Sequence, residues 1–125
     1  MGIFAEPRKL KPNERELLEF LLTADFPGRD ELKAQLQHVE VVGDCECGCG
    51  TIDLKVNEYP TRAFVEEPIP VEARGEGIEV LLFVRGGLLC SLEIVDYEDR
   101  RPLPYPSIRD LELWVTPARK PPASD

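Results

Sequence analysis

Two runs of alternating side chains meet at a glycine pair in the stretch Ile78-Glu79-Val80-Leu81-Leu82-Phe83-Val84-Arg85-Gly86-Gly87-Leu88-Leu89-Cys90-Ser91-Leu92-Glu93-Ile94-Val95-Asp96-Tyr97. Glycine accepts the positive φ angles that a type I′ turn requires, so the pair predicts a two-residue turn between antiparallel strands at residues 78–85 and 88–97. The pairs in this register are Val84–Leu89, Phe83–Cys90, Leu82–Ser91 and Leu81–Leu92. We expect a long β-hairpin.

This register assigns every hairpin side chain to one of two faces. One face would carry Leu81, Phe83, Leu88, Cys90, Leu92 and Ile94, and the opposite face Ile78, Val80, Leu82, Val84, Leu89 and Val95. Both faces are mainly apolar, whereas an antiparallel sheet usually keeps one face for water. Helices would cover one face, and we expect the other to need either the chain from Arg101 onward, with Tyr105, Leu111, Leu113, Trp114 and Val115, or a second subunit.

Before residue 38 the apolar residues repeat with a helical period. Pro12, Asn13 as N-cap and Glu16 predict the start of a helix that runs to about Ala24. Its buried face would hold Leu17, Leu18, Leu21 and Leu22. A shorter helix is predicted from Asp30 through Gln37, presenting Leu32 and Leu36 to the same core.

Further strands are predicted at residues 38–42 and 51–56, with a short edge strand at 69–73 and a C-terminal one at 108–115. The sequence therefore predicts an α+β fold in which two N-terminal helices pack on one face of a four- to five-stranded, mainly antiparallel sheet. Residues 1–118 would form a single domain, and residues 119–125 a mobile C-terminal tail.

Charge narrows the classes of partner. The 125 residues carry a net charge of −9, and residues 38–100 alone hold 14 acidic and 5 basic side chains. An acidic surface repels phosphate backbones and anionic lipids, so we expect no nucleic-acid and no membrane partner, and a protein partner that is basic or a second copy of the chain. The N-terminus lacks a secretory signal, which favours a cytoplasmic location with reduced thiols.

Three of the four cysteines, Cys45, Cys47 and Cys49, lie within six residues. On an extended strand neighbouring thiols of this set would stand roughly 6.5 Å apart, but tetrahedral zinc requires sulfurs within about 4 Å of one another. Gly48 and Gly50 permit the turn that would bring them together, so zinc is the cofactor this segment would hold. Candidates for a fourth ligand are Cys90, His38, Asp44, Glu46 or water. The open alternatives are reduced thiols in a tight turn, a disulfide from Cys45 to Cys49 or, in a strained ring, to Cys47, and thiol-redox chemistry.

At Ala24-Asp25-Phe26-Pro27-Gly28, Cys47-Gly48-Cys49 and Thr51-Ile52-Asp53-Leu54, the chain resembles small uncharacterised bacterial proteins with a helix pair, a Cys-Gly-Cys element and an acidic β-hairpin. The resemblance covers residues 10–97 and implies a bacterial cytosolic setting, but no activity. The sequence has no serine-elbow signature and no phosphate-binding glycine loop. We therefore expect a non-enzymatic protein-interaction module, of immunity type or homodimeric. The alternatives are a structural zinc-binding domain and a thiol-redox protein.

Overall fold

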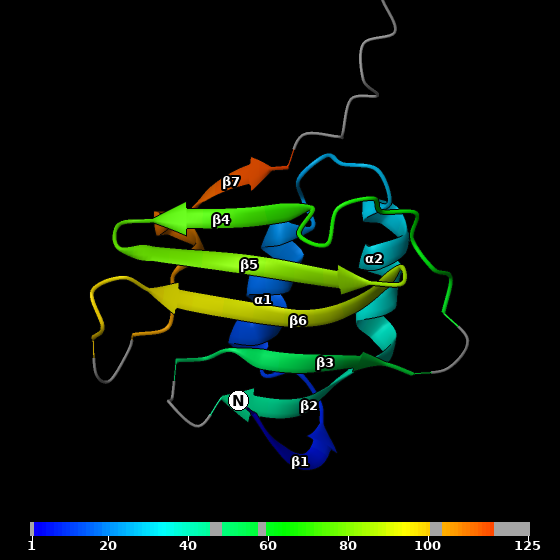
Figure 1. The fold of residues 1–125 in the computed structure, drawn as a ribbon, viewed down its shortest axis with the longest axis horizontal. Helices are drawn as coiled ribbons and strands as arrows, with labels where there is room; N and C mark the ends of the chain where they lie inside the picture. The colour runs from blue at the N-terminus through cyan, green and yellow to red at the C-terminus, as the bar shows by residue number, and fades with distance from the viewer. Residues whose placement is uncertain (1, 46–48, 58–59, 101–103, 117–125) are drawn as a thin grey trace, which may run out of the picture.

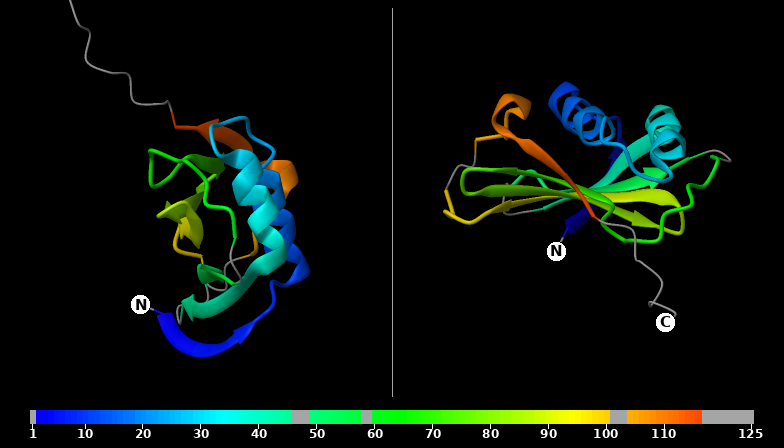
Figure 2. Two further views of the ribbon diagram at one scale, coloured as in Figure 1. Left: turned by 90° about the vertical axis from the view of Figure 1, so that its right-hand side faces the viewer. Right: turned by 90° about the horizontal axis from the view of Figure 1, so that it is seen from above.

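Seven strands form one antiparallel sheet in the order β1-β2-β3-β6-β5-β4-β7 (Figure 1). This computed structural model describes residues 2–45, 49–57, 60–100 and 104–116, with backbone alone at residues 2–5 and 45. The strands are β1 (Gly2–Arg8), β2 (Val39–Cys45), β3 (Ile52–Val56), β4 (Val71–Gly75), β5 (Ile78–Arg85), β6 (Leu88–Asp96) and β7 (Glu112–Val115). Helices α1 (Pro12–Leu21) and α2 (Arg29–Gln35) both lie on one side of the sheet (Figure 2), and 3₁₀ turns occupy η1 (Leu36–His38) and η2 (Ile108–Asp110).

The predicted α+β class is confirmed, but two details of the prediction are wrong. The sheet has seven strands rather than four to five, and the helices do not begin the fold because β1 precedes them. We did not predict strand β1, which contains Pro7. An edge strand tolerates proline, since one row of its N–H groups has no partner strand. The predicted tail at 119–125 lies outside the described residues.

Both helices begin earlier than predicted. Lys11, rather than Asn13, is the N-cap of α1, and its N–H donates to Glu14 Oε1 at 2.8 Å. Pro12 suits the first helical position because its missing N–H would have no partner there. Helix α2 begins at Arg29 after Gly28, which has a φ of +91°. A residue with a side chain would be strained at this φ, so glycine occupies the N-cap, and the helix begins one residue before the predicted start at Asp30.

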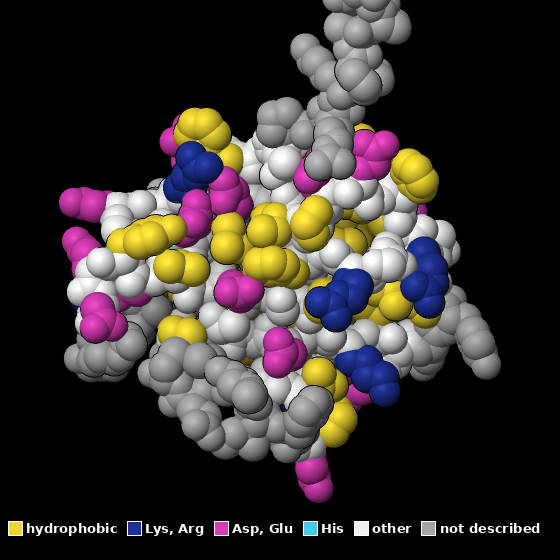
Figure 3. Space-filling view, viewed as in Figure 1, with side chains coloured by type: hydrophobic (Ala, Val, Ile, Leu, Met, Phe, Trp, Pro, Cys, Tyr) yellow, Lys and Arg dark blue, Asp and Glu magenta, His cyan; other side chains and the backbone are white. Residues whose placement is uncertain are grey.

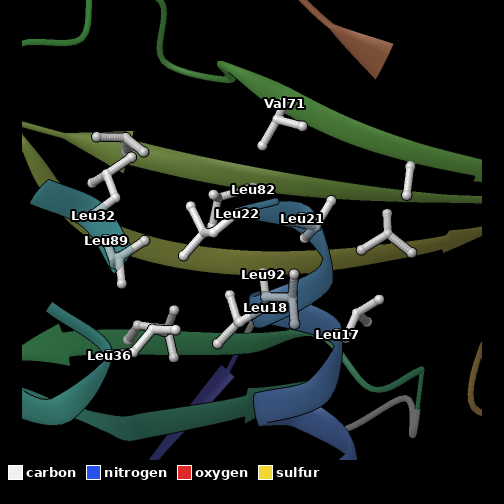
Figure 4. Close-up of a cluster of buried hydrophobic side chains, with 14 of the residues drawn as sticks. Leu17, Leu18, Leu21, Leu22, Leu32, Leu36, Val71, Leu82, Leu89 and Leu92 are labelled. Carbon is white, nitrogen blue, oxygen red and sulfur yellow. The ribbon is translucent and has the colours of Figure 1, made fainter. Parts of the chain in front are cut away.

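The core lies between the helices and the sheet. The predicted leucine stripe of α1 is confirmed, because all four of its members are at most 1% exposed: Leu17, Leu18, Leu21 and Leu22. They face leucines of the central strands, including Leu82, Leu89 and Leu92 (Figure 4). Burial of each leucine contributes roughly 1.5–3 kcal/mol, so packing of this stripe holds α1 on the sheet.

The central hairpin has the predicted turn but not the predicted register. Gly86 and Gly87 have φ angles of +58° and +78°, as a type I′ turn requires, and Val84 lies opposite Leu89 as expected. The next pair is Phe83 with Ser91, so Cys90 is the extra residue of a β-bulge.

The bulge corrects the predicted faces. Leu92 and Ile94 are buried on the helix side, while Val95 lies opposite Glu79 on the other side. Without the extra residue, Ser91 and Glu93 would lie in the core. The cost of burying a carboxylate explains why the strand adopts the bulge instead of the continuous ladder.

One of our predictions was that the chain from Arg101 onward covers the second face of the sheet, but residues 104–116, the described part of it, do not. Tyr105, Ile108, Leu111 and Leu113 pack against the helix-side core. Strand β7 then extends the sheet beside β4, with Trp114 opposite Glu72. No helix in the described ranges is both long enough and apolar enough to cross a membrane.

Candidate interaction face of the sheet

The side of the sheet opposite the helices is the open face. No helix of the described chain lies over it, and hydrophobic side chains gather along its centre (Figures 2 and 3). Strand alternation and register place four half-buried apolar residues on it, which we call the apolar strip: Leu81, Phe83, Leu88 and Val95. Solvent therefore reaches large apolar side chains at the middle of the widest surface of the sheet.

Aromatic and charged side chains border one end of the apolar strip. The Arg74 guanidinium lies 4.5 Å from the centre of the Trp114 ring, a cation–π distance. Arg74 also pairs with the carboxylates of Glu72 and Glu79. The Tyr97 hydroxyl donates to Glu79 Oε1 at 2.8 Å. The interactions join side chains of β7, β4 and β5 with Tyr97, which directly follows β6.

The hydrogen bond to Glu79 raises the pKa of the Tyr97 phenol, because the nearby carboxylate stabilises the protonated hydroxyl. Tyr97 is 69% exposed and Trp114 46% exposed. Tryptophan, tyrosine and arginine are the residue types that most often dominate the binding energy of protein interfaces. All three types occur together here, beside exposed apolar surface.

The sequence analysis did not find this group, and it treated Trp114 as a cover for the sheet. Strand β7 instead places Trp114 outward, because Leu113 packs toward the core and the neighbouring residue must face the other way. The alternation of Leu113 and Trp114 could have indicated that Trp114 faces away from the core. The contact with Arg74 could not be predicted from the sequence, since it depends on the pairing of β7 with β4.

The predicted cysteine site lies largely outside the described residues. Cys45 ends β2, but nothing of its side chain is described, and Cys47 falls in the undescribed range 46–48 together with Glu46. Cys49 is half-buried. The proposal of a zinc site formed by Cys45, Cys47 and Cys49 therefore stays a prediction.

The suggested fourth ligands lie in separate places. Asp44 accepts a hydrogen bond from Arg8 at 2.9 Å, Cys90 is the half-buried bulge residue of β6, and His38 ends η1. Among the residues whose side chains are described, no three or more of His, Cys, Asp and Glu are grouped so that they could hold a metal ion.

Arg8 joins the N-terminal elements to one another. It donates to both carboxylate oxygens of Glu14, at 2.9 and 3.0 Å, as well as to Asp44. Glu14 is only 4% exposed, so its charge is compensated by this bidentate pair and by the Lys11 N–H. The cluster links β1, α1 and β2, and we interpret it as structural.

A second apolar surface lies beside the loop before α2. Phe64 is 81% exposed and borders a hollow of about 260 Å³ that includes Phe26, Pro27, Val65 and Pro70. It contributes one large exposed aromatic side chain, whereas the open face combines an apolar centre with an ordered aromatic and charged border. We therefore take the open face as the main candidate.

Comparisons with protein-family models, with curated proteins and with solved structures each find no match to this chain. We therefore infer a function from the geometry of the open face.

Proposed function

We propose that this chain is a protein-interaction module that binds a partner protein through the open face of its sheet. The observation that carries the proposal is the position of the apolar strip: four partly exposed apolar side chains on a sheet face over which no described helix lies. Contiguous exposed apolar surface of this kind marks binding sites in proteins.

The border of the strip supports the same function. Trp114, Arg74 and Tyr97 are already fixed by contacts with one another or with Glu79, so they lose little conformational freedom on binding. The two carboxylates that Arg74 contacts also satisfy its charge in the unbound chain. A partner with an apolar centre and polar edges would match this pattern.

The test compares two phenylalanine substitutions of the full-length chain. Phe83→Ser removes the aromatic ring at the centre of the apolar strip, and Phe64→Ser removes an aromatic ring outside it, the most exposed one among the described residues. Tagged parent and variant chains are used to capture proteins from cells that express the chain naturally. Each captured protein is then purified and its Kd measured. Thermal unfolding checks that both variants fold.

We expect Phe83→Ser to weaken binding of the captured protein at least about tenfold, because truncation of a central aromatic anchor removes a large share of interface energy. Phe64→Ser should leave the Kd unchanged. Equal binding by the parent and the Phe83→Ser chain would contradict the proposal, and selective loss in Phe64→Ser would transfer the function to the hollow near Phe26.

A further inference from the structure

We infer that the partner on the open face is a second copy of this chain, related to the first by a two-fold axis that runs across the strands. This inference rests on the proposed function and names its partner. The distribution of charge along the open face and the register of β5 and β6 both favour such a dimer.

The two ends of the open face carry opposite charge. At the hairpin turn, Lys and Arg side chains gather (Figure 3), and the exposed ones are Lys55, Arg62 and Arg85. Toward the other end, Arg74 pairs with Glu79 and with Glu72, so this cluster holds two carboxylates against one guanidinium. Glu72 and Glu93 both lie opposite Leu81, nearer the middle of the face. A uniformly basic partner would be repelled by the hairpin end. A surface with the same two poles, reversed, would be attracted at both.

The chain itself presents that reversed surface. A two-fold axis across the strands lays each strand over its own counterpart in the opposite direction. With the axis at the level of Leu82, Arg85 lies three residues to one side and Glu79 three residues to the other. Arg85 therefore faces the partner's Glu79, and the partner's Arg85 faces Glu79. A two-fold axis along the strands would instead keep Arg85 at the level of the partner's Arg85 and lay one hairpin end over the other, so charge selects the first arrangement.

The same operation matches the apolar strip. On β5, Phe83 comes to lie over the partner's Leu81. On β6, Leu88 is opposite Arg85 and Val95 is opposite Glu79, so Leu88 lies over the partner's Val95. Two such sheets pack face to face about 10 Å apart with their strands within roughly 30° of each other. The same axis lays Glu93, opposite Leu81, over the partner's Ser91, which is opposite Phe83. Apolar contacts on both sides of this polar pair, with ion pairs at both ends, then form the interface.

The experiment exchanges the two charges and measures the mass of the full-length chain by analytical ultracentrifugation over a range of concentrations. Arg85→Glu places two acidic side chains at each of the paired positions, and Glu79→Arg places two basic ones there. The control is Glu19→Arg, which makes the same charge change as Glu79→Arg on an exposed position of α1, away from the open face. Circular dichroism confirms that each variant is folded.

We expect the parent chain and Glu19→Arg to dimerise equally. Arg85→Glu and Glu79→Arg alone should each dimerise at least about tenfold more weakly, because two like-charge contacts form per dimer. An equimolar mixture of these two variants should dimerise again, since a mixed dimer restores both oppositely charged contacts.

Three results would overturn the inference: a monomeric parent chain at every concentration, single variants that dimerise like the parent, or a mixture that stays monomeric. A monomeric parent whose captured partner still depends on Phe83 would leave the proposed function intact and make that partner a different protein. A monomeric parent chain, together with a captured protein that binds Phe83→Ser as tightly as the parent, would reject the proposed function as well.

Discussion

Gln35 shows how one buried side chain fixes the end of the central hairpin. It is 1% exposed, and its amide nitrogen donates to the carbonyl oxygens of Thr61 and Gly87, both at 2.9 Å. Its amide oxygen accepts the Leu89 N–H at 3.0 Å. Helix α2, the segment before β4 and the turn of the hairpin are thus joined through one amide, which has a partner for each polar atom.

Replacing this amide with a side chain that cannot form hydrogen bonds should destabilise the fold. We expect Gln35→Leu to lower the free energy of unfolding by about 1–3 kcal/mol, because the buried Leu89 N–H loses its partner. The control Gln37→Leu, an exposed position two residues later, should change it by less than about 0.5 kcal/mol. Urea denaturation measures both. Equal effects would show that the amide contacts contribute nothing specific.

At the scale of one element, β6 is shaped by its bulge. Side chains alternate regularly between the two faces at Leu88 and Leu89, and again from Ser91 onward. Because Cys90 is an extra residue, the second series is shifted by one position relative to the first. The extra residue lets Leu89, Leu92 and Ile94 all reach the core. The bulge is therefore the local solution that keeps carboxylates out of the core and apolar residues in it.

Deletions within β6 test this account. Removing Cys90 should leave a continuous ladder with every later side chain on its present face, so we expect the free energy of unfolding to stay within about 1 kcal/mol of the parent value. Removing Glu93 forces either Leu92 or Ile94 out of the core and should cost at least about 2 kcal/mol. Urea unfolding of the two deletion variants gives the comparison, and a Cys90 deletion as costly as the Glu93 deletion would refute it.

For the whole molecule, the main property is that its two sheet faces have different environments. The helices and the C-terminal segment pack on one face, and the described chain leaves half-buried apolar side chains on the other. Stability therefore depends on the strand residues that point toward the helices, and the proposed recognition on their neighbours, which point the other way. Substitutions of residues on the open face should therefore have little effect on folding.

Two adjacent leucines of β5 separate these roles. Leu82 is 0% exposed, so Leu82→Ala should lower the free energy of unfolding by about 2–5 kcal/mol through the cavity it leaves. Leu81 is half-buried on the open face, and Leu81→Ala should cost less than about 1 kcal/mol. Unfolding is measured at the lowest workable protein concentration, so that self-association does not contribute. Similar losses would mean that the described chain does not leave the second face open.

The amino-acid sequence by itself determined the α+β class, the leucine stripe of α1 and the Gly86-Gly87 turn, because each depends on residues that are close in the chain. Helical period and turn preference are local properties. It also located the cysteine segment, whose chemistry stays a prediction.

Only the tertiary structure decided the bulge at Cys90, the position of β1, and the pairing of Arg74 with Trp114 and Glu79. Each of these depends on which strand lies beside which, and a shift of one residue between strands moves every later side chain to the opposite face. Burial against the helices selects one of the registers that local sequence permits. That selection places the apolar strip and its charged ends on the open face.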